Sequence, residues 1–175
     1  RLDPLKGEPA SERLKGLTRE ELTGMLIENS DEPYAEEIAR AVMGEIKRGR
    51  EVATTTRLYE MIDRALAFIP EEERKEAVKK SCQRTFQALR IDVNSEFEVL
   101  YEFLDKLPGV LKPGGRAAIL TFHSGEDRIV KKSFKEMYRA GLYSQVATDV
   151  IRPTAEERRM NSRAHSTKMR WAVKA

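Results

Sequence analysis

The sequence of 175 residues contains few of the residue types that build covalent or metal-based sites. Its one cysteine, Cys82, excludes an internal disulfide framework and a multi-cysteine zinc site. Two histidines, His123 and His165, leave little with which to hold a metal ion. No metal site is therefore expected.

Long apolar runs and glycine motifs are missing as well. No run approaches the roughly 18 apolar residues of a membrane-spanning helix, and the mean hydropathy is −0.58. The ten glycines include no Gly-x-Gly, so no loop is expected to cradle a phosphate or to let the backbone approach a cofactor closely. We therefore expect a cytoplasmic protein, no contact with a membrane, and no cofactor-binding residues in this chain.

Charge is abundant and unevenly distributed. Charged residues make up 35% of the chain and hydrophobic residues 40%, a balance typical of a helix-rich protein with much charged surface. Residues 116–175 hold 13 Lys/Arg against 6 Asp/Glu, whereas residues 1–115 hold 19 against 23. A basic last third indicates a polyanionic partner, most commonly nucleic acid. The alternative is that these charges lie on solvated faces of helices and strands.

Residues 10–80 read as a small, mostly helical domain. Thr18 is a good N-cap, and Glu21 three residues later completes a capping box. Pro33 sits where a first-turn proline belongs, and Thr54 to Thr56 restart a third helix. From residue 81 the helical pattern continues, with Asn94 the expected break and an end at residues 108–109.

The remaining residues alternate between strand and helix patterns. The apolar run 117–122, bounded by a Pro-Gly-Gly turn and polar residues, is typical of a buried parallel strand. A helix is expected over 126–139, and strands near 143–151 and 168–173. This order predicts the second half of an α/β sheet with an antiparallel edge.

The first of these strands delivers His123, Glu126 and Asp127 to its carboxyl end. Open α/β sheets place their active-site crevice at this edge, so the three residues are the candidates for lining a catalytic pocket. The alternative is a simple helix start, with Ser124 as the cap and the two acids favoured in the first turn.

Two further segments are candidates for binding RNA phosphate and sugar. One is a polar helix stripe formed by Arg84, Gln87, Arg90 and Asn94. The other candidates belong to the basic last third and are Arg128, Arg163, Ser166 and Lys168. A solvated helix face and a polar loop with incidental charge are the respective alternatives.

Seven stretches, spread over nearly the whole chain, occur in the order of one known family. They are residues 1–3, 31–39, 84–96, 111–116, 121–131, 151–154 and 161–170. The longest reads Arg-Thr-Phe-Gln-Ala-Leu-Arg-Ile-Asp-Val-Asn-Ser-Glu. Together they resemble the MraW/RsmH-like family, the bacterial 16S rRNA cytosine-N4 methyltransferases. The chain departs from the family at Thr121, usually Ser, and at Gly125, usually Leu, which is expected to loosen the turn after His123.

The resemblance implies a class I S-adenosylmethionine-dependent methyltransferase domain, of Rossmann-like α/β fold, interrupted by a helical insertion. Residues 1–80 would be that insertion with a short N-terminal arm, and residues 81–175 the carboxyl half of the catalytic domain. The family's glycine-rich cofactor loop and acidic ribose-binding residue would precede residue 1. The chain is accordingly expected to be a fragment that is inactive alone.

The reaction implied by the resemblance is transfer of a methyl group from S-adenosylmethionine to the exocyclic N4 amine of a cytidine near the ribosomal decoding centre. The partner would be 16S rRNA or the small ribosomal subunit. A different class of function, a non-catalytic RNA-binding module that docks on ribosomal RNA or a ribosomal partner, stays open. Half a sheet leaves an unpaired edge, which predicts a homo-oligomer.

Overall fold

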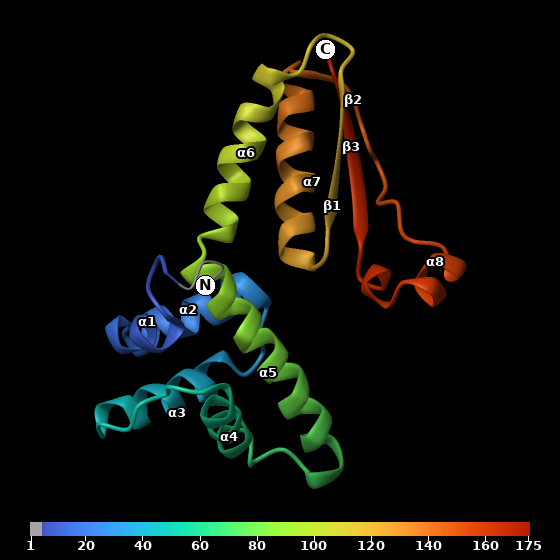
Figure 1. Cartoon of the computed structure of the whole chain (residues 1–175). Helices are drawn as coiled ribbons and strands as arrows, with labels where there is room; N and C mark the ends of the chain where they lie inside the picture. Colours follow the sequence, from blue (N-terminus) through green and yellow to red (C-terminus); the bar gives the residue numbers. More distant parts are fainter. Residues whose placement is uncertain (1–4) are drawn as a thin grey trace. The chain divides into compact units, whose positions relative to one another are not determined.

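A computed structural model describes residues 5–175, and the chain divides into two compact units, Arg1–Glu96 and Phe97–Ala175 (Figure 1). The resemblance at residues 1–3 lies outside the described residues. The division falls later than residue 80, where the sequence placed a domain boundary. One helix, α5 (Glu71–Val93), runs without interruption across that position.

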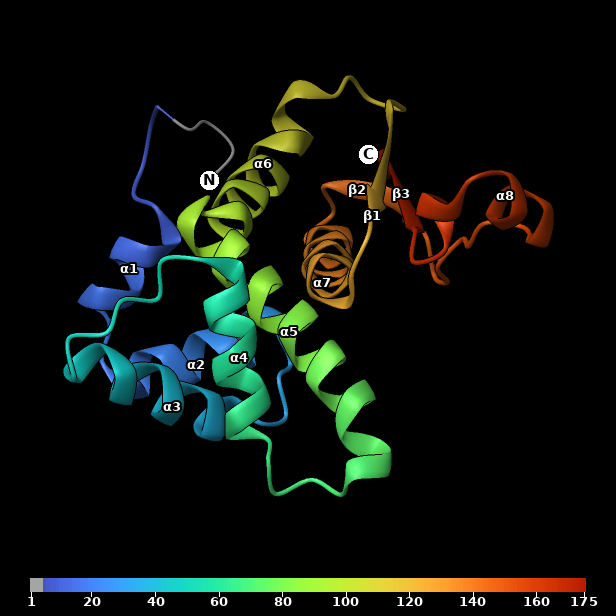
Figure 2. The same cartoon turned by 60° about the horizontal axis from the view of Figure 1, so that its bottom comes forward.

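Every regular element in the described part of the first unit is a helix, and besides α5 these are α1 (Ala10–Gly16), α2 (Arg19–Ser30), α3 (Ala35–Lys47) and α4 (Thr55–Ala65). Of these, α1, α2 and α4 pack against α5, while α3 packs against α2 and α4 (Figure 2). On α4, the buried side chains of Leu58, Met61 and Ile62 follow the three- and four-residue spacing of one helix face. Such faces meet in a single apolar core that also includes Cys82 and Leu89 of α5.

Local sequence signals set two of the helix starts in this unit, those of α2 and α4. The capping box is confirmed, because the Thr18 hydroxyl accepts from the Glu21 N–H while the Glu21 carboxylate accepts from the Thr18 N–H. The helix start predicted at residues 54–56 is confirmed, and Thr54 is the N-cap of α4. Pro33, however, lies ahead of α3 and not in its first turn, since Tyr34 is the N-cap.

The helix break predicted at Asn94 is confirmed. Asn94 is the C-cap of α5, and Ser95 follows with a left-handed φ of 49°. The next helix, α6, spans Glu96–Val110 and continues past the expected end, with Pro108 inside its last turn. Proline has no N–H, so the last turn of α6 lacks the helical hydrogen bond from residue 108 to the carbonyl of Leu104.

The second unit holds a three-stranded sheet in the order β1-β3-β2, with both pairs antiparallel. Its strands are β1 (Arg116–Thr121), β2 (Tyr143–Val146) and β3 (Lys168–Lys174). The other elements are α7 (Ser124–Arg139), α8 (Ala155–Met160) and a short 3-10 helix (Ser162–Ala164). The second expected strand is shorter than predicted, and only an isolated bridge joins Ile151 to Met169.

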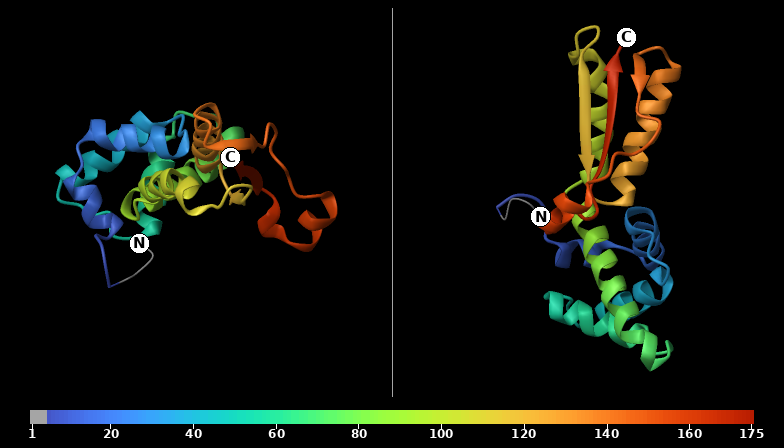
Figure 3. Two further views of the ribbon diagram at one scale, coloured as in Figure 1. Left: turned by 90° about the horizontal axis from the view of Figure 1, so that it is seen from above. Right: turned by 90° about the vertical axis from the view of Figure 1, so that its right-hand side faces the viewer.

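The prediction that the first strand is buried and parallel is wrong for the described residues. β1 pairs with β3 in antiparallel register, and Ala118 and Leu120 are exposed. The physical reason is one-sided cover: α6 and α7 lie on the same side of the sheet in two views (Figures 1 and 3). The inward-facing Ala117 and Ile119 pack against the core of this unit, around Phe134.

Candidate functional site

His123 sits directly after β1 and is the N-cap of α7. Its Nδ1 accepts a hydrogen bond from the backbone N–H of Glu126 at 3.4 Å. The cap is therefore His123 and not Ser124, which is the first helical residue. When Nδ1 of a neutral imidazole accepts, the proton resides on Nε2. That nitrogen is buried, forms no hydrogen bond, and lies 3.4 Å from Oε1 of Glu126.

Glu126 completes the helix start from the other direction. Its Oε2 accepts from the backbone N–H of Phe122 at 2.8 Å, so the strand end and the first turn of α7 are tied together. Burial raises the pKa of this carboxyl, but the imidazole of His123 and the N–H of Phe122 outweigh burial and leave the pKa below its usual value. Glu126 is an anion at neutral pH.

Asp127 joins α7 to β3 through a two-pronged ion pair. Arg170 Nε lies 2.7 Å from Oδ1 and Arg170 Nη2 lies 3.2 Å from Oδ2, while Lys168 Nζ lies 3.9 Å from Oδ2. The Arg170 side chain is 7% exposed and that of Asp127 is 14% exposed. Burial raises the pKa of Asp127, yet Arg170 and Lys168 hold it below its usual range.

The structure thus brings the three predicted pocket residues together at one end of the sheet, with Lys168 and Arg170 added from β3. The two carboxylates accept hydrogen bonds but bind protons weakly, because their pKa values are lowered. The chemistry this group offers is orientation of a donor such as an amine or hydroxyl.

Arg170 is the residue of this cluster that the sequence analysis missed. Residues two apart in a strand share a face, so Lys168 and Arg170 are expected to lie side by side once β3 is assigned. That alternation was the signal available in the sequence.

Gly125 lies in the first turn of α7 and is buried, and the loosening of this turn stays a prediction. A Cβ atom here would approach Phe97 Cζ to 2.8 Å and His123 Nδ1 to 3.2 Å. The aromatic rings of Phe97 and His123 are 6.0 Å apart. Glycine therefore allows both rings to pack against the helix start.

The glycines do not fit the role of a cofactor cradle. A Cβ atom added to a glycine would come within 3.4 Å of a neighbouring atom only at Gly115 and Gly125. The neighbours are Lys112 in a turn for Gly115, and Phe97 and His123 for Gly125.

The helix stripe predicted to bind RNA has partners inside its own unit. Arg84 Nη1 lies 4.0 Å from the buried Glu32 Oε2, and Gln87 donates to the carbonyl of Asn29. Arg90 pairs with Glu96 through two contacts of 2.9 Å. The fourth member, Asn94, donates to the carbonyl of Arg90 at the helix end. As RNA contacts these four residues remain a prediction.

The other predicted RNA contacts lie in the second unit. Arg128 is exposed on α7, and Arg163 and Ser166 are exposed in and after the 3-10 helix. Lys168 is largely covered and lies beside Asp127. Lys168 is thus engaged with the pocket candidates, and as RNA contacts all four residues remain a prediction.

Between residues 5 and 175, no three His, Cys, Asp or Glu side chains gather in a way that could hold a metal ion. In the same range, no helix has both the length and the apolar content needed to cross a bilayer.

Comparison with known proteins decides the family. The model of the MraW methylase family matches residues 1–175. The chain belongs to the MraW methylase family. Within the family, it is 67% identical over its whole length to ribosomal RNA small subunit methyltransferase H 1 of Lachnoclostridium phytofermentans, and covers 48% of that protein. It is 63% identical to the protein of the same name from Agathobacter rectalis, again over the whole chain and 50% of the relative.

A third family member is ribosomal RNA small subunit methyltransferase H 2 of Alkaliphilus metalliredigens, with 58% identity over the whole chain and 50% of the relative. The chain therefore spans about half the length of the curated relatives that it matches.

Proposed function

We infer that this chain is part of an enzyme that methylates the exocyclic N4 amine of a cytidine in 16S rRNA near the decoding centre, with S-adenosylmethionine as the methyl donor. The observation that carries this proposal is the family match over residues 1–175, together with three relatives named as small subunit rRNA methyltransferases. The proposed rRNA substrate supports a further proposal, that the enzyme acts in the cytoplasm with the small ribosomal subunit as its partner.

The two parts of the chain would have different tasks. Residues 1–80 are proposed to be a helical insertion and residues 81–175 the carboxyl half of a class I methyltransferase sheet. The free edge of β1 and its exposed outer face are consistent with a larger sheet, because further strands and helices could pair with and cover them. This part of a family protein is proposed to be inactive without the rest.

Methyl transfer to this amine requires that a weak nucleophile be oriented. The lone pair of a cytidine amine is delocalised into the ring, so the amine has to be held in line with the methyl group and hydrogen bonded as charge develops. The base also has to be unstacked from a structured RNA before it can enter a pocket. Glu126 and Asp127 are proposed to line that pocket with His123, as anionic hydrogen-bond acceptors at the start of α7.

The direct test is nucleoside analysis of rRNA. A polypeptide of the relatives' full length that contains this chain is incubated with labelled S-adenosylmethionine and undermethylated small ribosomal subunits. We expect N4-methylcytidine after digestion and mass spectrometry, and no product with the present chain alone. Methylation of another atom or base would overturn the proposed specificity. RNA binding without any methyl transfer would favour the non-catalytic RNA-binding module.

Substitution of His123 tests the pocket assignment. His123→Asn keeps an N-cap side chain, since Asn caps helices well, whereas His123→Ala loses both the cap and the imidazole. If His123 lines the pocket, both variants lower the methylation rate in the full-length polypeptide. Full activity of His123→Asn would limit the residue to its capping role.

A further inference from the structure

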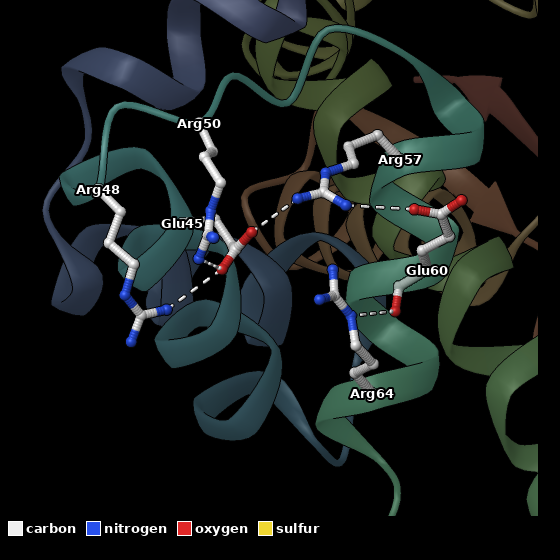
Figure 4. Close-up of polar contacts among 6 residues, drawn as sticks. All are labelled: Glu45, Arg48, Arg50, Arg57, Glu60 and Arg64. Atoms are coloured by element: carbon white, nitrogen blue, oxygen red, sulfur yellow. Dashed lines mark hydrogen bonds and ion pairs between the residues drawn. The ribbon is translucent and has the colours of Figure 1, made fainter.

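Three arginines surround the carboxylate of Glu45 near the end of α3 (Figure 4), and two more, one on α3 and one in the last turn of α4, line the same surface depression as Glu45. The five come from α3, from the loop that follows it and from α4: Arg40, Arg48, Arg50, Arg57 and Arg64. We call these five residues the arginine surface. None of them was a candidate site residue in the sequence analysis.

Glu45 holds three of these side chains in place. Its Oε1 accepts from Arg48 at 3.1 Å and from Arg50 at 2.5 Å, and its Oε2 accepts from Arg57 at 2.7 Å. The Glu45 side chain is only 9% exposed, whereas the guanidinium groups reach solvent. A buried carboxylate thus offsets the mutual repulsion of three cations and fixes their positions.

The arginine surface keeps an excess of positive charge and of hydrogen-bond donors. A guanidinium has five N–H donors, and one carboxylate accepts only a few of them. Besides Glu45, the carboxylate that contacts the surface is Glu60, which lies 3.3 Å from Arg57. Arg64 donates to the backbone carbonyl of Glu60, and in the part of the chain that the structure describes neither Arg40 nor Arg64 pairs with a carboxylate.

This local excess stands out because the unit around it is acidic. Residues 1–96 hold 17 Lys/Arg against 20 Asp/Glu. If these charges were scattered uniformly, the helical unit would have no basic site. The local excess of positive charge arises because α3, α4 and the loop between them place their arginines on the same part of the surface.

The surface is also hollowed. A depression of about 390 Å³ is lined by Arg40, Arg48, Arg64 and Glu45, with Met61 and the small residues Ala41, Gly44 and Ala65 beside them. Small side chains leave space between the cations, and the planar fork of arginine matches two oxygens of a phosphate group. The size, charge and donor geometry suit a phosphodiester group.

We propose that the arginine surface binds the phosphodiester backbone of RNA, at a place separate from the pocket candidates on α7. The proposal rests on the inferred function, because the chosen polyanion is the RNA that such an enzyme would act on. Phosphate contacts fix the position and register of a nucleic acid without reading its bases. The arginine surface is accordingly a positioning site, and Glu45 organises it.

Binding of a short fluorescein-labelled single-stranded RNA of mixed sequence to the 175-residue chain tests the proposal. The test variant carries Arg40→Gln, Arg48→Gln and Arg64→Gln, which removes the three arginines that line the depression. We expect the Kd, measured by fluorescence anisotropy near 100 mM salt, to rise by about tenfold. The slope of log Kd against log salt concentration should fall by about two, since each lost phosphate contact removes about 0.7.

The matched control removes the same charge elsewhere in the same unit. Lys75→Gln, Lys79→Gln and Lys80→Gln lie on exposed positions of α5, outside the depression. We expect this variant to change the Kd less than threefold. Circular dichroism of both variants verifies that the helical unit is folded. Equal weakening by the two variants, or no RNA binding by the original chain, would overturn the proposal.

Two further measurements separate the alternatives. Vesicles containing anionic lipid replace RNA in a sedimentation assay, and binding lost in the same arginine variant would assign the surface to a membrane instead. If the arginine surface does not bind RNA but the inferred function is correct, nucleoside analysis of the full-length polypeptide will still detect N4-methylcytidine. The two proposals can therefore be rejected independently. Conversely, RNA binding by the arginine surface without methyl transfer would keep the site and reject the enzyme.

Discussion

At the scale of single residues, most of the polar side chains that the sequence suggests as site residues have partners within the chain. Arg84 approaches the buried Glu32, Gln87 ties α5 to α2, and His123 caps a helix. The residue types and their spacing were visible in the sequence. Their partners were not, because Glu32 and Asn29 lie more than 50 positions from the side chains that they meet.

Glu32 is the clearest case, and it leads to a stability prediction. Its buried carboxylate accepts from the Ser81 hydroxyl at 2.7 Å and from the Tyr34 N–H at 3.1 Å. Glu32→Ala leaves those donors unpaired, so we expect the free energy of unfolding to fall by about 3 kcal/mol. Urea denaturation followed by far-ultraviolet circular dichroism measures the loss. The exposed Glu28→Ala is the control, with a change within about 0.5 kcal/mol.

Asp127 gives a pH prediction for the second unit. Its pKa lies below the ordinary 3.8, and that of Glu126 below 4.5, so both groups stabilise the fold above those ordinary values. The stabilisation is lost as the pH falls through the ordinary values toward the lowered ones. Trp171, the one tryptophan of the chain, lies on β3, so its fluorescence follows the unfolding of the second unit.

We therefore expect the urea midpoint from Trp171 fluorescence to drop between neutral pH and about pH 3. Asp127→Asn leaves the guanidinium of Arg170 without its partner, and should cost about 3 kcal/mol at neutral pH. The urea midpoint of this variant should also change less with pH than the midpoint of the original chain. An identical acid dependence in the two proteins would contradict the assigned role of Asp127.

At the scale of elements, the helices were largely predictable because their signals are local. The Thr18 capping box, the Thr54 cap and the break at Asn94 are each determined by residues within a few positions of one another. The strands were less predictable. Both the burial and the pairing direction of β1 depend on β3, which lies about 50 residues further along the chain.

The capping box of α2 allows a test with an internal control. Thr18→Ala removes the side-chain acceptor of the Glu21 N–H, and we expect a loss of about 1 kcal/mol in the free energy of unfolding. Thr23→Ala makes the same chemical change inside α2, where the hydroxyl bonds back to the Arg19 carbonyl. There alanine should be neutral or slightly stabilising. Similar losses in the free energy of unfolding from both variants would show that the loss in Thr18→Ala does not come from removal of the cap.

At the scale of the whole molecule, the chain consists of two units with separate cores. The helical unit buries residues from α1 to α5, while the second unit buries a smaller group around Phe134 and Tyr143. In the second unit β1 has one strand neighbour among the described residues, and Leu120 beside its free edge is 56% exposed. An unpaired edge with an apolar side chain is an association surface.

We therefore predict self-association of the 175-residue chain through β1. Light scattering should report a mass above that of the monomer, rising with protein concentration. Leu120→Lys places a charge beside the edge and should shift the mass toward the monomer. Val99→Lys, at an equally exposed position on α6, is the control and should leave the mass unchanged. A monomer at every concentration of the original chain would exclude this association.

The sequence by itself determined the starts of α2 and α4, the break at Asn94 and the membership of the MraW methylase family, since these depend on short-range patterns and on motif order. Only the tertiary structure decided which polar residues are occupied internally and which are available. Arg40 and Arg64 are far apart in sequence and become neighbours because α3 packs on α4. The antiparallel pairing of β1 likewise depends on contacts between distant residues, which no local pattern encodes.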